Sequence, residues 1–168
     1  VLFGAIAQGR TEVDNFLQSE DCLATLNAMV AMGVPIDRPE PGRVVVQGVG
    51  LRGLKTPSAA LDMGNAGTAM RLSMGLLAGQ SFGATLIGDA SLSRRPMERA
   101  ATPLRLMGAR IDTTNGRPPV TVHGGQRLQG IDYRLEVASA QVKSAILIAG
   151  LYAHGRTRVL EPAVTRDH

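Results

Sequence analysis

Two segments of the chain place their apolar residues on one face of a helix. Between residues 21 and 32, leucine, alanine and methionine recur at helical spacing behind a capping run that starts at Ser19. Residues 96–107 show the same arrangement, with Pro96 at the first position. A glycine follows each segment, as expected at a helix end. Both patterns predict amphipathic helices that cover a core with one face.

Other segments predict buried helices and short strands. Residues 67–78 and 140–152 are apolar almost all round, which is typical of helices inside a core. The turn residues Asn115 and Gly116 lie between two β-branched runs and predict a hairpin. The predicted strands are residues 44–47, 85–88, 111–113, 120–123, 132–137 and 156–160.

These elements recur with a period of about 75 residues. The matching segments are residues 32–37 with 107–112, 45–48 with 121–124, 75–79 with 150–154, and 9–11 with 155–157 after two periods. One period holds an amphipathic helix, a hairpin, a buried helix and a strand. The sequence therefore predicts an α+β (α/β) fold built from repeated units.

The repeat also predicts where the units are interrupted. Residues 1–7 correspond to residues 147–153, within a buried helix, and Asp167 corresponds to Asp21, at the start of an amphipathic helix. We therefore expect residues 1–168 to hold slightly more than two units of a longer protein.

Composition places the chain among folded domains. Of its 168 residues, 44% are hydrophobic and 19% are charged, so it can bury a core and is not compositionally disordered. No apolar run approaches the ~18 residues that span a bilayer. Cys22 is the single cysteine, which excludes an internal disulfide framework and a cysteine-rich zinc site and fits a reducing cytoplasm.

Charge favours an anionic ligand. The chain has 18 basic and 14 acidic residues, and apart from Lys55 and Lys143 every basic residue is arginine. Arginine pairs with phosphate or carboxylate through two parallel hydrogen bonds. A GC-rich genome would produce the same bias. Nucleic-acid binding is disfavoured, because aromatic residues make up 3% of the chain and the basic residues are scattered.

The loop before residue 67 has the features of an anion site. Asn65, Gly67 and Thr68 stand at the start of a buried helix, where free N–H groups and the helix dipole attract negative charge. The alternative is an ordinary helix start, with Asn65 as the cap and Gly67 as the turn. Asp62 and Asp89 flank such loops, where each carboxylate could take part in chemistry or as easily be a hydrogen-bond acceptor that stabilises the loop, and they form no strong general acid–base pair.

Two more loops occupy comparable places before helices. Arg95 precedes one helix, either aimed at an anion or forming a solvated pair with Arg94. Ser139 and Gln141 open the next buried helix, either as a cap or as ligands of a phosphate or a sugar-like ring. Lys143 interrupts that helix, either at its rim or buried against an anion.

A final loop holds Thr165 and Arg166. Pseudo-symmetric units would bring these helix N-termini to one end of the domain. Arg95, Arg166 and Arg71 would then face one anion, with Arg95 directed toward Gln141. His123, His154 and His168 lie apart and match no nucleophile motif, so we assign no catalytic residue and expect no metal site.

The motifs together resemble the 5-enolpyruvylshikimate-3-phosphate (EPSP) synthase family. They are residues 64–71 (GNAGTAMR), Gly88-Asp89 with Arg95-Pro96-Met97, residues 139–144 (SAQVKS) and residues 165–168 (TRDH). The resemblance extends over the whole chain. It implies a two-domain fold in which each domain has βαβαββ-type units around buried helices. Residues 1–168 would be part of the N-terminal domain, without its first segment and without the C-terminal domain.

The resemblance also implies an activity and substrate contacts. Such enzymes transfer the enolpyruvyl group of phosphoenolpyruvate to the 5-hydroxyl of shikimate-3-phosphate and release phosphate, without a cofactor, in the cytoplasmic pathway to aromatic amino acids. Arg95 would bind phosphoenolpyruvate, beside the loop of Asn65, Gly67 and Thr68. The remaining contacts, to shikimate-3-phosphate, would come from Ser139, the backbone of Ala140, Gln141, Thr165 and Arg166. Arg71 would support the loop. A methyl group at Gly67 should crowd glyphosate, an anionic mimic, more than the substrate.

The resemblance implies missing parts as well. A Gly-Asp-Lys-Ser segment would lie before Val1, and the acidic catalytic residues would lie in the other domain. We therefore expect residues 1–168 alone to be inactive. The missing domain would be a structural partner, and we expect neither nucleic acid nor membrane as a partner.

Three other interpretations remain at this point. The related UDP-N-acetylglucosamine enolpyruvyl transferases carry a reactive cysteine in the loop around Arg95, where this chain has none, since Cys22 lies in a predicted helix. An RNA-binding module of related fold would use the basic charge. A non-catalytic half could pair with a separate chain.

Overall fold

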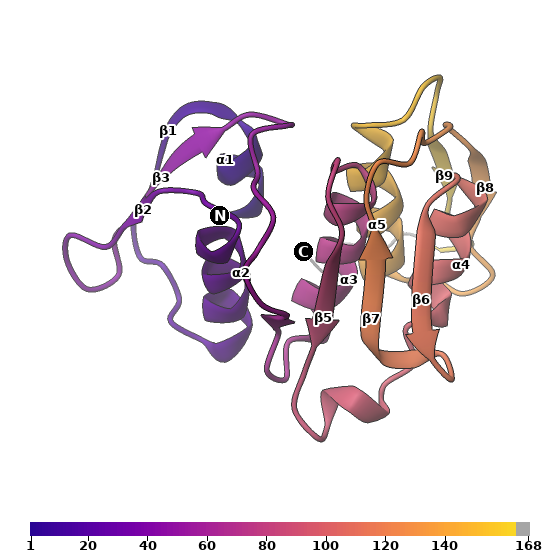
Figure 1. The fold of residues 1–168 in the computed structure, drawn as a ribbon, viewed down its shortest axis with the longest axis horizontal. Coiled ribbons are helices and arrows are strands. Elements are labelled where there is room, and N and C mark those ends of the chain that lie inside the picture. The colour runs from indigo at the N-terminus through magenta and orange to yellow at the C-terminus, as the bar shows by residue number, and fades with distance from the viewer. Residues whose placement is uncertain (164–168) are drawn as a thin grey trace.

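The computed structural model describes residues 1–163 and shows the repeat as successive units (Figure 1). The first unit comprises α1 (Leu2–Ile6), β1 (Gln8–Val13), α2 (Glu20–Ala31), β2 (Ile36–Asp37), β3 (Val44–Val49) and β4 (Leu61–Asp62). The second comprises α3 (Gly67–Ala78), β5 (Ala84–Ile87), the 3₁₀ turn η1 (Leu92–Arg94), α4 (Glu98–Leu106), β6 (Arg110–Thr114), β7 (Arg117–His123) and β8 (Asp132–Arg134). The third begins with α5 (Ala140–Gly150) and β9 (Arg158–Leu160). The predicted α+β repeat is confirmed.

The last strand of each unit joins the sheet of the next unit. The described strands form sheets in the orders β1-β3-β2, β4-β5-β7-β6 and β8-β9. β4 runs parallel to β5, and β8 runs parallel to β9, whereas the pairs within a unit are antiparallel. Counted from β4, the order of elements is β-α-β-α-β-β, as the resemblance implied. Gly33 and Gly108, one period apart, end α2 and α4 with φ angles of +83° and +98°, which glycine adopts without strain.

The helices α3 and α5 pack side by side at the centre of the core, behind β5 and β7 in the view of Figure 1. Thr68 lies beside Gln141 near the start of both helices, and Gly75 lies beside Ala145 further along, so the helices run in the same direction. A Cβ atom at Gly75 would stand only 2.2 Å from the carbonyl oxygen of Ala145. The missing side chain therefore permits close backbone contact, and both helix N-termini reach the same end of the domain.

Several boundaries differ from the predictions. α4 begins at Glu98 rather than at residue 96, because Met97 is the capping residue and donates its N–H to Gly116 O at 2.7 Å. β8 ends at Arg134 rather than at residue 137, because Arg134 is the last residue that pairs with β9. The strands β1, β2 and β4 were not predicted. β1 is mostly exposed and polar, so its strand conformation depends on pairing with β3, from Gln8 opposite Val49 to Val13 opposite Val44.

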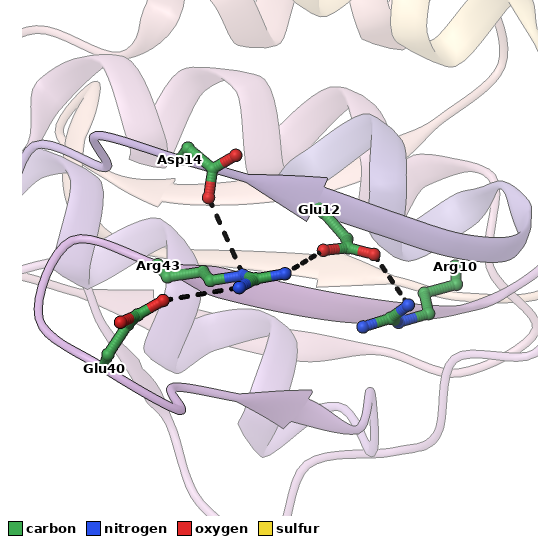
Figure 2. Close-up of polar contacts among 5 residues, drawn as sticks. All are labelled: Arg10, Glu12, Asp14, Glu40 and Arg43. Carbon is green, nitrogen blue, oxygen red and sulfur yellow. Dashed lines mark hydrogen bonds and ion pairs between the residues drawn. The ribbon is translucent and has the colours of Figure 1, made fainter.

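An ion-pair cluster, defined as Arg10, Glu12, Asp14, Glu40 and Arg43, connects β1 with the loop before β3 (Figure 2). Glu12 is central, because one carboxylate oxygen lies 2.6 Å from Arg10 Nη1 and the other 2.5 Å from Arg43 Nη2. The hydrogen bond from Arg43, followed by the charge of Arg10, lowers the pKa of Glu12 below its ordinary value. The cluster is solvent-exposed, so its contribution to stability is screened by salt.

We expect Glu12→Gln to lower the melting temperature slightly at pH 7 and not at all in acid. A lowered folded-state pKa stabilises the fold above the ordinary pKa of glutamate, and this contribution is lost as the pH falls through the lowered value. Melting curves at pH 7 and pH 3, in low and high salt, measure the effect. Glu136→Gln is the control, since Glu136 forms no ion pair within residues 1–163. Equal melting temperatures for the Glu12→Gln protein and wild type at pH 7 in low salt would contradict the prediction.

Candidate functional site

Arg95 is held at the end of η1 by the loop that precedes α3. Its Nη2 donates a hydrogen bond to Oδ1 of Asn65, and its backbone N–H donates to Leu92 O at 2.9 Å. Asn65 Nδ2 in turn donates to Asp89 Oδ2 at 2.8 Å. The other carboxylate oxygen of Asp89 accepts the N–H of Leu92 at 2.7 Å. Two loops separated in sequence are thereby joined beside the N-terminus of α3.

Arg71 connects this region to α5. Its Nη1 donates to Gly67 O at 3.1 Å and to Gln141 Oε1 at 2.9 Å, and its Nη2 donates to Pro96 O at 2.9 Å. Burial, and then the positive charges of Arg95 and Arg99, lower the pKa of Arg71 from its ordinary value. All of these hydrogen bonds go to neutral acceptors. This agrees with the expectation that Arg71 supports the loops.

Gln141 completes the connection between the two buried helices. Its Nε2 donates to Thr68 Oγ1 at 2.9 Å, while its Oε1 accepts from Arg71. Ser139 caps α5, with Oγ accepting the N–H of Val142 at 3.4 Å, and Ala140 follows as the first helical residue. The N-termini of α3 and α5 therefore lie together, each with N–H groups that have no partner within a helix.

Gly67 lies between the two arginines. A Cβ atom built on it would be 2.9 Å from Arg71 Nη1 and 3.2 Å from Arg95 Nη1. Arg95 therefore lies directly beside Gly67, and Gln141 is connected to Gly67 through Arg71. This agrees with the convergence of helix starts that the pseudo-symmetry predicted. Within residues 1–163 Arg95 forms no ion pair, so its charge is not neutralised by a direct carboxylate contact.

The structure thus brings most of the predicted site residues together. Asn65, Gly67, Thr68 and Arg95 lie close together at the start of α3. Gln141 reaches this group from α5, directly after Ser139 and Ala140. Thr165 and Arg166 lie outside the described residues, so their predicted contacts stay predictions. Whether any of these residues binds a substrate also stays a prediction.

The structure also shows the surroundings of Asn65 and Lys143, for which the sequence left alternatives open. Asn65 is not a helix cap, because Ala66 holds that position and forms no side-chain cap bond. The side chain of Asn65 is instead engaged by Arg95 and Asp89. Lys143 pairs with Glu161 at 3.1 Å on the flank of α5.

Residues 1–163 contain no group of three or more histidine, cysteine, aspartate or glutamate side chains that could hold a metal ion. None of the helices described in this range combines the length and apolar character required to cross a membrane. His123 pairs with Asp112 at 2.6 Å on the exposed hairpin of β6 and β7 rather than at this site.

The chain is similar to known proteins along its whole length. The family model for EPSP synthase (3-phosphoshikimate 1-carboxyvinyltransferase) matches residues 1–168. A 3-phosphoshikimate 1-carboxyvinyltransferase from Methylococcus capsulatus is 63% identical over the whole chain, and one from Legionella pneumophila is 52% identical. The solved EPSP synthase from Acinetobacter baumannii superposes with a TM-score of 0.97 at 60% identity and covers 99% of the chain.

The chain matches only part of the length of these relatives. The chain spans 39% of the length of the Methylococcus and Legionella relatives and 38% of the Acinetobacter structure. These findings support the first interpretation of the motifs, and none of them favours a UDP-N-acetylglucosamine enolpyruvyl transferase or an RNA-binding module. With the family model covering every residue, the chain belongs to the EPSP synthase family.

Proposed function

We propose that the protein containing this chain transfers the enolpyruvyl group of phosphoenolpyruvate to the 5-hydroxyl of shikimate-3-phosphate. The bond between the enolpyruvyl carbon and the phosphate oxygen breaks, a bond to the 5-hydroxyl oxygen forms, and phosphate leaves with the hydroxyl proton. The names of the similar proteins, 3-phosphoshikimate 1-carboxyvinyltransferase, support the acceptor and the transferred group in this proposal. The same proposal includes a cytoplasmic location, the place of this chain in the N-terminal domain, and a C-terminal domain as its structural partner.

The observation that carries the proposal is the charge of Arg95, which forms no ion pair within residues 1–163, beside the joined N-termini of α3 and α5. Its guanidinium is oriented by a neutral amide, so it can still form charge-assisted hydrogen bonds with phosphate or carboxylate. The helix N-termini add their partial positive charge to the same place. An anion as small and as highly charged as phosphoenolpyruvate suits this arrangement.

The second substrate would be held from α5. In the proposal, Ser139, the backbone of Ala140 and the amide of Gln141 bind shikimate-3-phosphate, together with Thr165 and Arg166. The hydrogen bonds of Gln141 to Arg71 and Thr68 support this, because they hold its amide at the start of α3, near Arg95. Gln141 would thus touch both substrates. We assign the proton transfers to the part of the enzyme beyond this chain.

The test uses the full-length protein. We expect it to release phosphate when phosphoenolpyruvate and shikimate-3-phosphate are both present, with stoichiometric formation of the enolpyruvyl ether. UDP-N-acetylglucosamine as the acceptor should give no release, and RNA should not bind in a salt-dependent manner. Failure to release phosphate with shikimate-3-phosphate would overturn the proposal.

Gly67→Ala in the full-length protein should weaken inhibition by glyphosate about tenfold or more, with a smaller increase in KM for phosphoenolpyruvate. The new methyl group meets the ends of Arg71 and Arg95, which can shift, so the fold should remain. A ligand that reaches further toward Gly67 loses more than a shorter one, and a tenfold loss corresponds to about 1.4 kcal/mol. Inhibition constants measured against phosphoenolpyruvate test this. An unchanged constant would contradict the proposed pose.

A further inference from the structure

Asp89 contacts both groups that orient Arg95. Its Oδ2 accepts a hydrogen bond from the side-chain amide of Asn65, and its Oδ1 accepts the backbone N–H of Leu92, the first residue of η1. η1 leads directly to Arg95, whose own N–H donates to Leu92 O. The backbone N–H of Asp89 also donates to Gly64 O at 2.9 Å, which joins its loop to that of Asn65.

An amide side chain has a donor end and an acceptor end, and Asp89 determines which end Arg95 meets. An ionised carboxylate only accepts hydrogen bonds, so the NH₂ group of Asn65 must face it. The carbonyl oxygen then faces the guanidinium of Arg95. The reverse orientation would place NH₂ against guanidinium N–H groups with no acceptor between them, and the carbonyl oxygen against the Asp89 carboxylate with no donor between them.

We propose that Asp89 is a positioning residue for Arg95, acting through Asn65 to hold the guanidinium where the phosphoenolpyruvate anion binds. This inference rests on the proposed function. Asp89 itself contacts no substrate. The hydrogen bonds from Leu92 and then Asn65 lower the pKa of Asp89, so the carboxylate stays ionised at neutral pH and the orientation of the amide persists there.

The amide of Asn65 explains how the carboxylate of Asp89 can position Arg95 without forming an ion pair with it. A carboxylate in direct contact with Arg95 would form an ion pair and compete with an anionic ligand. With Asn65 between them, Asp89 and Arg95 have no direct ion pair. The guanidinium is fixed on one side and remains available on the other.

A double-mutant cycle in the full-length enzyme tests the route through Asn65. Asp89→Ser retains a hydroxyl that can accept the N–H of Leu92 and is too short to reach Asn65. Alone, it should raise KM for phosphoenolpyruvate about tenfold, with KM for shikimate-3-phosphate within twofold of wild type. In an Asn65→Ala background, the same substitution should change KM for phosphoenolpyruvate by less than twofold.

Melting temperatures and a matched control separate positioning from general stability. Asp112→Ser removes another exposed carboxylate, which pairs with His123 on the hairpin of β6 and β7, and should leave both KM values within twofold. Additive effects of Asp89→Ser and Asn65→Ala, equal increases in both KM values, or no effect of Asp89→Ser in an active enzyme would each overturn the inference alone. A wild-type enzyme without enolpyruvyl transfer would overturn the proposed function and this inference with it.

Discussion

Replacing Arg95 by alanine in the full-length enzyme should lower kcat/KM for phosphoenolpyruvate by about 100- to 1,000-fold. A charged, partly buried contact to an anion contributes roughly 3–4 kcal/mol when one partner is removed, and each 1.4 kcal/mol is about tenfold. Arg95 is suited to this contact because it is oriented by Asn65 and forms no ion pair within residues 1–163. Steady-state kinetics with shikimate-3-phosphate at saturation measure the loss.

Arg94 supplies the matched control. It is adjacent in sequence and exposed, and no hydrogen bond or ion pair connects it to the site residues described above. Arg94→Ala should therefore keep kcat/KM within twofold. Arg95→Lys should recover only part of the loss, because lysine keeps the charge and loses the planar fork. Similar losses for Arg94→Ala and Arg95→Ala would show a general effect of surface charge and contradict the assigned role of Arg95.

Gly75→Ala should destabilise the domain by about 1–3 kcal/mol, because α3 and α5 leave no room for a methyl group there. The new Cβ would lie 2.2 Å from Ala145 O, and because that atom belongs to the backbone of α5, the helices must separate. Alanine favours a helix over glycine by about 1 kcal/mol, which offsets only part of this cost. Thermal unfolding measures the change.

Ser73→Ala, on the same helix, should not lower the stability of the domain. Ser73 is fully buried and its hydroxyl has no hydrogen-bond partner within residues 1–163, so its removal takes away an unsatisfied polar group. We expect the melting temperature to stay equal or to rise. A Gly75→Ala protein that melts with wild type would show that the backbones of α3 and α5 are free to move apart. Loss of stability in both proteins would point instead to general intolerance of α3.

The repeat made much of the architecture and the centre of the site predictable. Thr68 and Gln141 are 73 residues apart, close to one period, and occupy equivalent places in successive units. Parallel buried helices therefore bring them together at one end of the core. The same reasoning predicted that Arg95 would lie at this end of the domain, directed toward Gln141, and the two residues lie on either side of Arg71 and Gly67. Local patterns sufficed here because the relevant residues stand at helix starts.

Other features depend on partners that a local pattern does not contain. β1 is polar along most of its length, and its strand conformation follows from its register with β3. β2 and β4 have two residues each, which is too short for an alternating pattern of apolar and polar residues to be recognised. The sequence suggested Asn65 as a cap, whereas its amide is engaged by Asp89 and Arg95, 24 and 30 residues further along the chain. Only the packed loops determine that choice.

The donation of β4 to the sheet of β5 has a consequence for dissecting this chain. A cleavage site placed between β4 and α3, where the repeat suggests a natural boundary, would divide the sheet β4-β5-β7-β6 between two fragments. Each fragment would then expose unpaired backbone N–H and C=O groups along a strand edge. The two pieces should consequently recognise each other when mixed, so a split reporter made at this boundary would reassemble through the restored parallel pair.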